Sequence, residues 1–494
     1  MPGDNMSNEE WAQAVISATK GFGKDIHYSE RAKQLRGFIK QGLLKFTDLR
    51  DNPERFFAAH RILLTPGNGH GLGGEGMSVA FTVSFNLWAG SILGLGNPEQ
   101  VAALNEAQSK GTLGCFCLTE KYAGVNSGLV VQTTATWSPE RQQFLLDTPD
   151  DGAKKNWISQ GLTATSAVVI ANLNIKGKFY GPHAFVMKIR DEETGELVSG
   201  VTMEDMGLKV CSNDLDNATV SFKDVWIDKS CLLSRYADIR NDEYVQTTET
   251  KMRLEVIGQR LLTGRLAIAE ASVEFAKRIF KKARAYADAK VCWAPKGLPQ
   301  PRLSEIPHIA AIFAEGDARL DMMTAYNAAV EKRICKVLLA ESIPDDELVE
   351  AIAVSKIRSV ATAIDLTDKL KRELGSYSLM AESGMQSNPW LLNCSFAEGD
   401  GRILMQKIAR DSMKVFQKTS WKDTGREMIF GSSPEQQEMK LRFQLSRVLS
   451  AATSPADGAR IWNENYELIY ALANAVCDKH IAKNIGEDKL IAKL

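Results

Sequence analysis

The sequence has no excess of either charge and few side chains that bind metals. Its 60 Lys and Arg residues balance 61 Asp and Glu residues, for a formal net charge of −1. Bulk charge therefore gives no reason to expect a nucleic acid or an acidic membrane as a partner. The six histidines are dispersed and no His-Glu-x-x-His motif occurs, so we expect no catalytic metal. An anionic ligand would have to be met by local cations.

The chain also lacks a pattern of cysteines that could crosslink the fold. Only two of its eight cysteines are close in sequence, as the pair Cys115-x-Cys117. This spacing fits neither a zinc site nor a dense disulfide framework, so we expect the protein in a reducing compartment.

Long apolar runs are missing as well. No run of about 18 apolar residues is evident, so we expect no transmembrane helix. The first residues are acidic and lack an apolar core, which argues against a secretory or mitochondrial leader. The chain ends in Ala492-Lys493-Leu494, a small-basic-leucine variant of the tripeptide that directs proteins to peroxisomes. We therefore expect a peroxisomal location, with a mitochondrial or cytoplasmic location as the alternatives.

The order of periodic segments predicts an α+β protein with three domains. A chain of 494 residues can bury roughly three quarters of the surface that it exposes when unfolded. Residues 1–112 carry apolar residues at helical spacing, with a strong helix start at Asn97-Pro98. Residues 113–235 contain several short β-rich runs, two of them joined by the hairpin signature "SPER". Residues 236–494 return to long amphipathic helices.

A glycine-rich segment in the N-terminal part satisfies the pattern G-x-G-x-x-G with Gly69, Gly71 and Gly74. A dinucleotide-binding loop would need a preceding strand and an acid about 20 residues later. The residues before it have helical character, and the first acid after Glu75 is Glu99. We therefore favour a loop between helices.

Three short segments could carry chemistry. Thr119 ends a predicted strand before a glycine-containing loop, and Trp157 precedes Ser159 by two residues; this set suits a planar heterocycle, or a plain turn with a core Trp. In "NCSFAEGDGRILMQKIARD", Glu398 precedes Gly399 and a helical run. Acids are common in first helical turns, so Glu398 could cap a helix or act as a base.

Taken in this order, these segments resemble the acyl-CoA dehydrogenase/acyl-CoA oxidase superfamily. "LTEKYAGVNSGLVVQTTATWSPERQQFLLDTP" and "GVTMEDMGLKVCSNDLDNATVSFKDVWI" look most like the oxidase branch, and the resemblance covers about residues 80–415. It implies an N-terminal helical domain, a central antiparallel β-barrel or sandwich domain and a C-terminal helical bundle. It also implies FAD as the cofactor and an acyl-CoA thioester as the substrate.

The resemblance further implies roles for individual residues. Glu398 would be the catalytic base, with Phe396 and Ala397 keeping its carboxylate dry, and Gly399 would let the thioester approach. Arg265 would line the acyl-CoA pocket. The position that matches Gly264 carries the base in other branches, and glycine cannot serve there. The FAD contacts would come from Thr119 at the pyrimidine edge, Trp157 beside the ring, Ser159 near N5, and from Gly161, Asp400, Gly375 and Lys290.

The family's pyrophosphate contact, here Lys290, comes from a neighbouring subunit, so the resemblance implies a homodimer or a higher homo-oligomer. Three features depart from the family: Leu374 replaces one adenine-site glycine, Lys290 replaces an arginine, and Gln160 is typical of dehydrogenases. The leading hypothesis is an acyl-CoA oxidase of fatty acid β-oxidation, with dioxygen reoxidising the flavin to give hydrogen peroxide. The alternatives are a dehydrogenase that passes electrons to an electron-transfer flavoprotein and a flavin-poor scaffold or assembly partner.

Overall fold

The computed structural model describes residues 6–22, 26–64, 66–67, 70–71, 74–123, 131–249, 254–418 and 433–485. The chain forms two compact units, of which the first comprises Met1–Ala267 and Ile334–Ile343 and the second Ile268–Arg333 and Pro344–Leu494. The predicted N-terminal helical and β domains both fall within the first unit, and a boundary at residue 112 stays a prediction. The tripeptide Ala492-Lys493-Leu494 lies outside the described residues.

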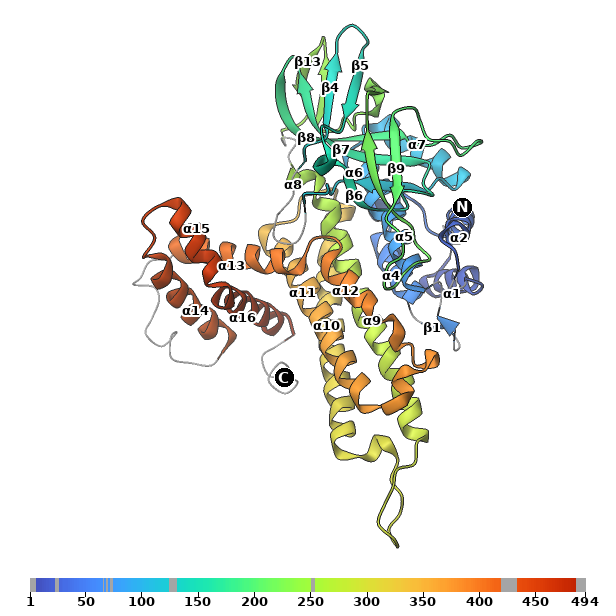
Figure 1. Ribbon diagram of the computed structural model, residues 1–494, viewed down its shortest axis with the longest axis vertical. Helices are drawn as coiled ribbons and strands as arrows, with labels where there is room; N and C mark the ends of the chain where they lie inside the picture. Colours follow the sequence, from blue (N-terminus) through green and yellow to red (C-terminus); the bar gives the residue numbers. More distant parts are fainter. Residues whose placement is uncertain are drawn as a thin grey trace. The chain divides into compact units, whose positions relative to one another are not determined.

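The first unit begins with helices (Figure 1). The expected start at Asn97 is confirmed: its side chain accepts a hydrogen bond from the Gln100 N–H at 2.9 Å, Gln100 caps in return, and Pro98 occupies the first turn. The helices of this unit are α1 (Asn8–Thr19), α2 (Tyr28–Gln41), α3 (Asp48–Asp51), α4 (Pro53–Leu64), α5 (Gly74–Thr82), the π-helix η1 (Val83–Trp88), α6 (Ala89–Leu95), α7 (Pro98–Lys110) and α8 (Leu254–Ile257).

The glycine-rich segment follows the helix α4, as expected, and its own short strands β1 (Pro66–Gly67) and β2 (His70–Gly71) pair only with each other. No strand of the larger sheets precedes it among the described residues, so the dinucleotide-fold context is missing there. Gly69 lies outside the described residues.

One segment departs from the expectation that no stretch of the chain is apolar enough to cross a membrane. The continuous helical segment Glu75–Leu95 has a mean hydropathy of 1.4 over an 18-residue window. However, 83% of that window is buried inside the protein, as in the core helix of a globular unit. Its aromatic residues Phe81 and Phe85 pack against each other, with ring centroids 4.7 Å apart.

The β strands follow the helices of the first unit. They are β3 (Gly114–Cys117), β4 (Thr134–Ser138), β5 (Gln143–Asp147), β6 (Lys155–Ser159), β7 (Ser166–Ile175), β8 (Lys178–Lys188), β9 (Val201–Asp205), β10 (Asn217–Phe222), β11 (Val225–Asp228), β12 (Ala237–Arg240) and β13 (Glu243–Gln246), with the 3-10 turns η2 (Asp151–Ala153) and η3 (Lys229–Cys231). The predicted hairpin is confirmed, because β4 and β5 pair antiparallel with Ser138 opposite Gln143.

The sheet arrangement corrects one detail of the prediction. One sheet has the order β11-β5-β4-β7-β3, with β8 also paired to β7, and a second has the order β6-β10-β9. Most pairs are antiparallel, but β7 runs parallel to both β3 and β4. Parallel neighbours need a long crossover, and the chain between β3 and β7 supplies one that no local hairpin signal can reveal. The domain is therefore a mixed rather than a purely antiparallel β structure.

The helices of the first unit meet the larger sheet at a glycine. A Cβ at Gly114 on β3 would fall 1.9 Å from the ring of Trp88, so only glycine allows this approach. Trp88 then reaches β7, where its indole N–H donates to the Ser166 hydroxyl at 3.1 Å. Strand β7 is buried along Ala167–Ala171 without alternation, as expected of a strand covered on both faces.

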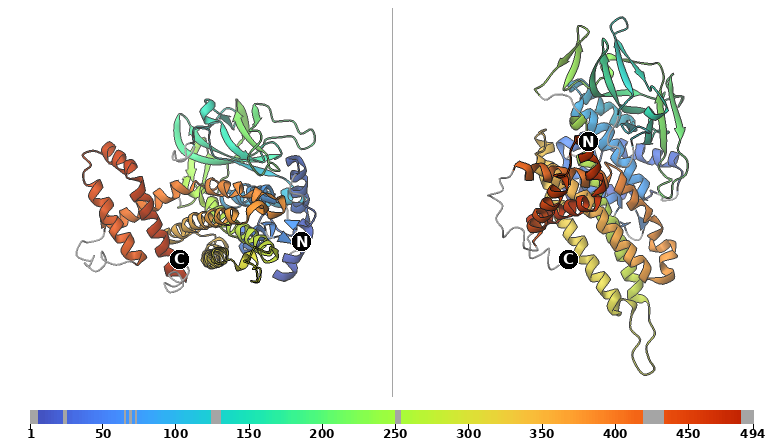
Figure 2. Two further views of the ribbon diagram at one scale, coloured as in Figure 1. Left: turned by 60° about the horizontal axis from the view of Figure 1, so that its bottom comes forward. Right: turned by 60° about the vertical axis from the view of Figure 1, so that its left-hand side comes forward.

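The second unit is helical, which confirms the predicted C-terminal bundle. Figures 1 and 2 show α9, α10 and α11 side by side, and polar contacts join them: Arg284 with Asp317 at 2.6 Å and Arg319 with Asp365 at 2.6 Å. The elements are α9 (Gln259–Ala289) and α10 (Pro307–Leu339), which also contribute residues to the first unit, then η4 (Leu303–Glu305), α11 (Asp346–Glu373), η5 (Gly375–Leu379), η6 (Ala381–Ser383), η7 (Met385–Ser387), α12 (Pro389–Phe396), α13 (Gly401–Lys418), α14 (Pro434–Leu449), α15 (Pro455–Glu464) and α16 (Tyr466–Ile485).

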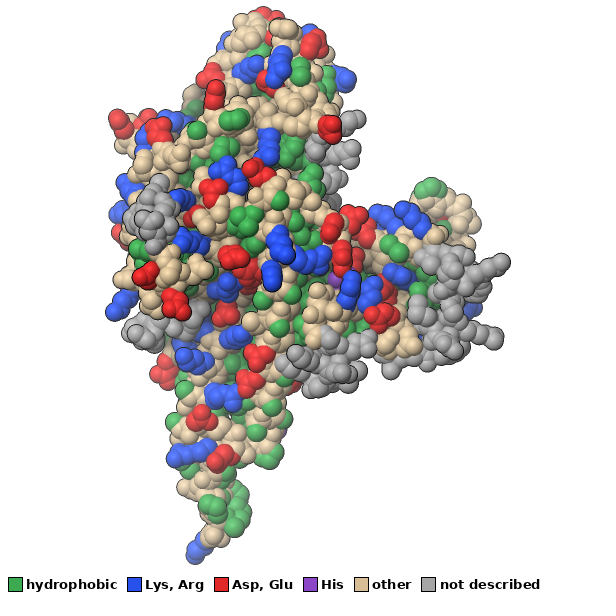
Figure 3. All heavy atoms as spheres, turned by 180° about the vertical axis from the view of Figure 1, so that it is seen from behind, with side chains coloured by type: hydrophobic (Ala, Val, Ile, Leu, Met, Phe, Trp, Pro, Cys, Tyr) green, Lys and Arg blue, Asp and Glu red, His purple; other side chains and the backbone are tan. Residues whose placement is uncertain are grey.

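Charged side chains of both signs are mixed over the molecular face that Figure 3 shows. This mixture agrees with the formal net charge of −1 and with a surface that attracts ligands through local groups rather than through one extended field.

Candidate functional site

In the first unit, the structure brings together the four residues that we call the strand-edge group: Thr119, Trp157, Ser159 and Gly161. The Asn156 N–H donates to the Thr119 carbonyl at 2.8 Å, which joins the end of β3 to the beginning of β6. Strand β6 then carries Trp157 and Ser159, and Gly161 follows it directly. The predicted contacts of the isoalloxazine ring therefore come from adjacent stretches of backbone.

Trp157 is not a core residue, which excludes that alternative. Its side chain is 58% exposed, and its backbone φ is +57°, in the left-handed region that non-glycine residues rarely adopt. An aromatic ring held out of the core by an unusual backbone conformation is a signal of function rather than of packing. Nearby, the Ser159 hydroxyl accepts a hydrogen bond from the Asn217 side chain at 3.0 Å, which fixes its position.

Gly161 and its neighbour Gln160 are also fixed by contacts within the first unit. A Cβ at Gly161 would lie 2.6 Å from the Cβ of Ala218, so Gly161 is required there by packing between β6 and β10. Gln160, which departs from the oxidase pattern, has a φ of +64° and is buried. Its side-chain amide donates to the Ser84 hydroxyl at 3.0 Å and to the Gly114 carbonyl at 3.1 Å.

A buried ion pair that sequence reasoning missed supports the strand-edge group. Lys155 Nζ lies 2.8 Å from Glu120 Oε1, and the two side chains are 0% and 1% exposed. Lys155 also donates to the Ile170 carbonyl at 2.7 Å, while Glu120 accepts the N–H groups of Gln132 and Thr133 at 2.7 and 3.0 Å. Burial lowers the pKa of the Lys155 ammonium, and the Glu120 carboxylate opposes that effect.

In the second unit, Glu398, Gly399 and Asp400 form the turn between α12 and α13, which we call the Glu398 turn. Glu398 has a φ of +58° and Gly399 a φ of +100°. Glu398 is half-buried, and its Oε2 atom is buried. Left-handed backbone at an acid is uncommon and persists only where the surroundings hold it in place.

The helix cap in this segment is Asp400. Its Oδ1 atom accepts the N–H groups of Arg402 at 2.7 Å and Ile403 at 3.3 Å, at the beginning of α13. The capping role that Glu398 could have had thus belongs to its neighbour. Phe396 is 56% exposed, and its expected part in keeping the Glu398 carboxylate dry stays a prediction.

Lys356 on α11 contacts the backbone of this turn. Its ammonium donates to the carbonyls of Ala397 and Gly399, and lies 3.4 Å from the Ser395 carbonyl. The residue is 1% exposed. Sequence reasoning missed it, although a lysine in line with the buried residues Ile352 and Val360 at i, i±4 spacing is a readable signal of a buried charge.

In the second unit, the segments that carry the predicted FAD contacts Lys290 and Gly375 are joined by two stacked tyrosine rings. Tyr286 on α9 stacks on Tyr377, with ring centroids 4.0 Å apart and planes 4° apart. The exposed Lys290 follows Tyr286 by one helical turn, with its N–H on the Tyr286 carbonyl at 2.9 Å. Gly375, with a φ of +60°, lies two residues before Tyr377.

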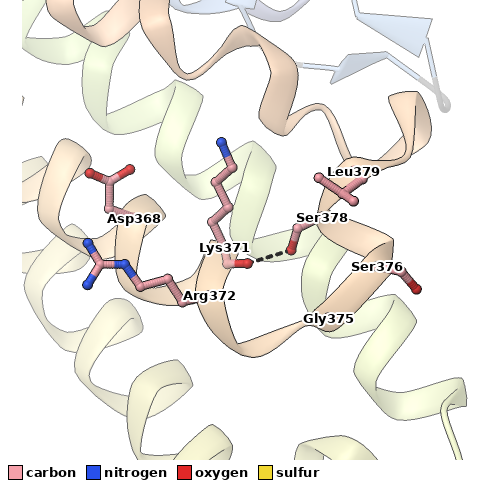
Figure 4. Close-up of a pocket in the computed structure, with 7 residues that line it drawn as sticks. All are labelled: Asp368, Lys371, Arg372, Gly375, Ser376, Ser378 and Leu379. Atoms are coloured by element: carbon pink, nitrogen blue, oxygen red, sulfur yellow. Dashed lines mark hydrogen bonds between the residues drawn. The ribbon is translucent and has the colours of Figure 1, made fainter.

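Gly375 also lines a hollow of about 620 Å³ at the end of α11 (Figure 4). The side chains of Lys371 and Arg372 border it with that of Asp368, and the Ser378 hydroxyl donates to the Lys371 carbonyl at 2.7 Å. Two cations and one acid give this hollow a positive balance that suits an anionic group.

Arg265 lies on the part of α9 that belongs to the first unit, where it is half-buried, and the preceding Gly264 is buried. The strand-edge group also belongs to the first unit, whereas the Glu398 turn, Lys290 and Gly375 belong to the second.

Comparison with curated proteins finds acyl-CoA oxidases. The chain is 27% identical over 445 residues to an acyl-coenzyme A oxidase from Candida glabrata, covering 84% of this chain and 58% of the relative. It is 28% identical over 414 residues to the peroxisomal acyl-coenzyme A oxidase 2 of Arabidopsis thaliana, covering 80% and 58%. The chain thus spans less than two thirds of the length of both relatives. No protein-family model matches it.

Solved structures of two acyl-CoA oxidases and of one acyl-CoA dehydrogenase share the fold. An acyl-CoA oxidase from tomato superposes with a TM-score of 0.79 at 19% identity, over 97% of this chain and 77% of that one. The Caenorhabditis elegans acyl-CoA oxidase-2, solved with FAD, ascaroside-CoA and ATP, gives 0.78 at 17% identity, over 98% and 76%. A glutaryl-CoA dehydrogenase from Mycobacterium smegmatis gives 0.63 at 18% identity, over 84% and 97%.

The sequence matches and the shared fold agree: over most of its length the chain is similar to members of the acyl-CoA dehydrogenase/acyl-CoA oxidase superfamily. The Candida and Arabidopsis relatives are both oxidases, which is the branch that the sequence motifs resemble.

Proposed function

We propose that the protein is an FAD-dependent acyl-CoA oxidase that introduces an α,β double bond into acyl-CoA thioesters in fatty acid β-oxidation. The observation that carries the proposal is the Glu398 turn. It holds an acid in left-handed backbone with one carboxylate oxygen buried, in a chain whose curated relatives are acyl-CoA oxidases.

Glu398 acts as the base in this proposal. Its carboxylate takes the proton from the α carbon, beside the thioester carbonyl, and the proton stays on the carboxylate oxygen. Removal of so weakly acidic a proton needs a base fixed in position before the substrate arrives, because a free carboxylate reacts too slowly. Gly399 carries no side chain and leaves room for the thioester, and Arg265 lines the acyl-CoA pocket.

The residues present fit FAD. The strand-edge group offers the hydroxyls of Thr119 and Ser159 and an exposed indole, a set that suits the polar edge and the flat face of an isoalloxazine. Lys290, Gly375 and the cationic hollow suit the pyrophosphate and adenine, and Asp400 lies next to the base. Bound FAD would supply the acceptor for the β hydrogen and deliver the electrons to dioxygen, giving hydrogen peroxide.

We propose at least a homodimer, in which Lys290 and Gly375 of one subunit serve the FAD of the other. We also propose a peroxisomal location, supported by the tripeptide Ala492-Lys493-Leu494 and by the name of the Arabidopsis relative. Electron transfer to an electron-transfer flavoprotein and a flavin-poor scaffold are the other candidates, and the curated relatives do not favour them.

A spectroscopic experiment separates these candidates. The purified protein is expected to be yellow, with close to one FAD per chain, and acyl-CoA added without oxygen should bleach the flavin band. Air should then restore the band rapidly. Flavin that bleaches but reoxidises slowly would instead identify a dehydrogenase, and a protein that holds no FAD would identify a scaffold.

A further inference from the structure

Lys356 is a charged residue that is buried in the middle of the long helix α11. It lies in the middle of α11, on the side of that helix that packs on α12 and α13, and is 1% exposed. A lysine is almost never buried this fully unless its ammonium is paired or hydrogen-bonded. Here the ammonium is met by carbonyl oxygens of residues 395–399.

The carbonyls that Lys356 contacts all lie at the C-terminal end of α12 or directly after it. They belong to the last turn of α12 and to the segment that leaves it, where backbone carbonyls have no partner within the helix and where the helix dipole favours a cation. The Ala397 and Gly399 carbonyls flank Glu398 on either side. The Lys356 ammonium therefore donates hydrogen bonds to the backbone both before and after Glu398.

The turn that Lys356 contacts has a backbone conformation that non-glycine residues rarely adopt. Glu398 and Gly399 both have positive φ, and such a turn relaxes unless contacts fix it. On the far side, Asp400 caps α13 and fixes the exit of the turn. Lys356 binds the backbone on both sides of Glu398, so the base is held between two anchored helix ends.

We propose that Lys356 is a positioning residue, which holds the Glu398 turn so that the carboxylate is preorganised for proton removal. The inference rests on the proposed function of Glu398 and deepens it. Lys356 acts through the backbone of residues 395–399 and needs no contact of its own with substrate or cofactor.

The test compares Lys356→Met, which keeps the length and apolar stem of the side chain but removes its donors, with Lys369→Met on the same helix. Lys369 is partly exposed and pairs with Glu315 and Asp365, away from the turn. Amide hydrogen exchange is measured by mass spectrometry on peptides that cover residues 395–401. Flavin content, the dissociation constant of acyl-CoA and the rate of anaerobic flavin reduction at saturating acyl-CoA are measured on the same preparations.

We expect wild-type amides in 395–401 to be protected, and Lys356→Met to lose that protection while the rest of α11 keeps it. The reduction rate should fall at least about tenfold, because a small displacement of a base is costly, while FAD content and acyl-CoA affinity stay within about twofold. Lys369→Met should change neither the exchange nor the rate. A purely structural role for Lys356 would lower FAD content, affinity and rate together.

The inference is overturned if the wild-type turn exchanges as fast as an exposed loop, or if Lys356→Met reduces its flavin at the wild-type rate. Should Lys356→Met not fold, Lys356→Gln keeps a shorter donor and takes its place, with the same two outcomes. Failure of the proposed function has a different signature. A wild-type protein that no acyl-CoA reduces refutes the enzyme assignment, while hydrogen exchange still reports whether Lys356 holds the turn.

Discussion

At the scale of single residues, the Glu398 turn places an unusual demand on its first position, which has left-handed backbone. Left-handed backbone favours glycine, and asparagine or aspartate tolerate it better than glutamate. The chain nevertheless has glutamate there, directly before a glycine that takes the larger positive φ. Strain that a glycine would have relieved is retained, which supports a chemical role for the carboxylate.

The first prediction concerns that carboxylate. Glu398→Gln keeps the shape of the side chain and removes the base, so we expect the rate of anaerobic flavin reduction by acyl-CoA to fall by about 10²–10⁴-fold. FAD content and acyl-CoA binding should be unchanged. Stopped-flow absorbance of the flavin band measures the rate. Glu382→Gln, at an acid of η6 outside the turn, is the matched control. Wild-type reduction by Glu398→Gln would mean that another group is the base.

A second residue, His60, should make the stability of the first unit depend on pH. It is buried between Phe56 and Phe81, and its Nε2 atom contacts the Thr82 hydroxyl. That hydroxyl donates to the Ser78 carbonyl at 2.9 Å, so the ring must donate through Nε2–H, which leaves the buried Nδ1 atom as the site of protonation. Burial lowers the pKa of His60 to about 3 from 6.5.

The second prediction is a loss of stability in acid. Below pH 6.5 the unfolded chain protonates His60 while the folded chain does not until about pH 3, so the unfolded state binds more protons and stability falls as pH falls. Between pH 7.5 and 5 this loss is about 2 kcal/mol. His60→Gln keeps a donor for Thr82 and removes the titration, so urea unfolding at both pH values should show a loss smaller by that amount. An identical loss in both proteins would refute this account.

At the scale of elements, the ion pair of Glu120 and Lys155 joins the end of β3 to the beginning of β6. Both side chains lie out of solvent, and backbone groups from β7 and from the residues before β4 complete their hydrogen bonds. Thr119 precedes the first partner directly and Trp157 follows the second by two residues. This pair therefore joins the same two segments of backbone that carry Thr119 and Trp157.

The third prediction follows from the cost of an unpaired buried charge. Lys155→Met leaves the Glu120 carboxylate buried without its cation and should lower the free energy of unfolding by about 3–5 kcal/mol. The double variant Glu120→Gln/Lys155→Met buries no charge and should recover a large part of that loss. Chemical denaturation of the two variants and the wild type measures the difference. A double variant no more stable than Lys155→Met alone would show that the charge is not the cause.

The elements also show how far the sequence predicts this structure. The order of helices, strands and helices, the hairpin at 138–143 and the cap at Asn97 follow from local spacing, and each is present. The parallel pairing of β7 with β3 and β4 has no local signal, because strand partners far apart in sequence are chosen by packing. For the same reason, the contact of Lys356 with the Glu398 turn joins residues about 40 positions apart and cannot be read from either segment alone.

At the scale of the whole molecule, the predicted FAD contacts divide into two sets. The strand-edge group supplies one set from the first unit, and Lys290 and Gly375 supply the other from the second. In the proposed homodimer, the second set serves the FAD of the other subunit. Such a dimer is symmetric, so each of its two sites would combine the base of one chain with Lys290 of its partner.

The last prediction tests this exchange by mixing two inactive forms. Glu398→Gln removes the base, and Lys290→Glu places a negative charge where the pyrophosphate should bind, so each homodimer alone should be nearly inactive. A mixed dimer has one site with both defects and one site with none. Random reassembly should therefore restore about a quarter of the wild-type activity, since half of the dimers are mixed and each has one intact site of two. Sedimentation equilibrium before and after mixing checks that the dimer exists and reassembles. If Lys290 served its own chain, no mixed dimer would contain an intact site, and the mixture would stay as inactive as its components.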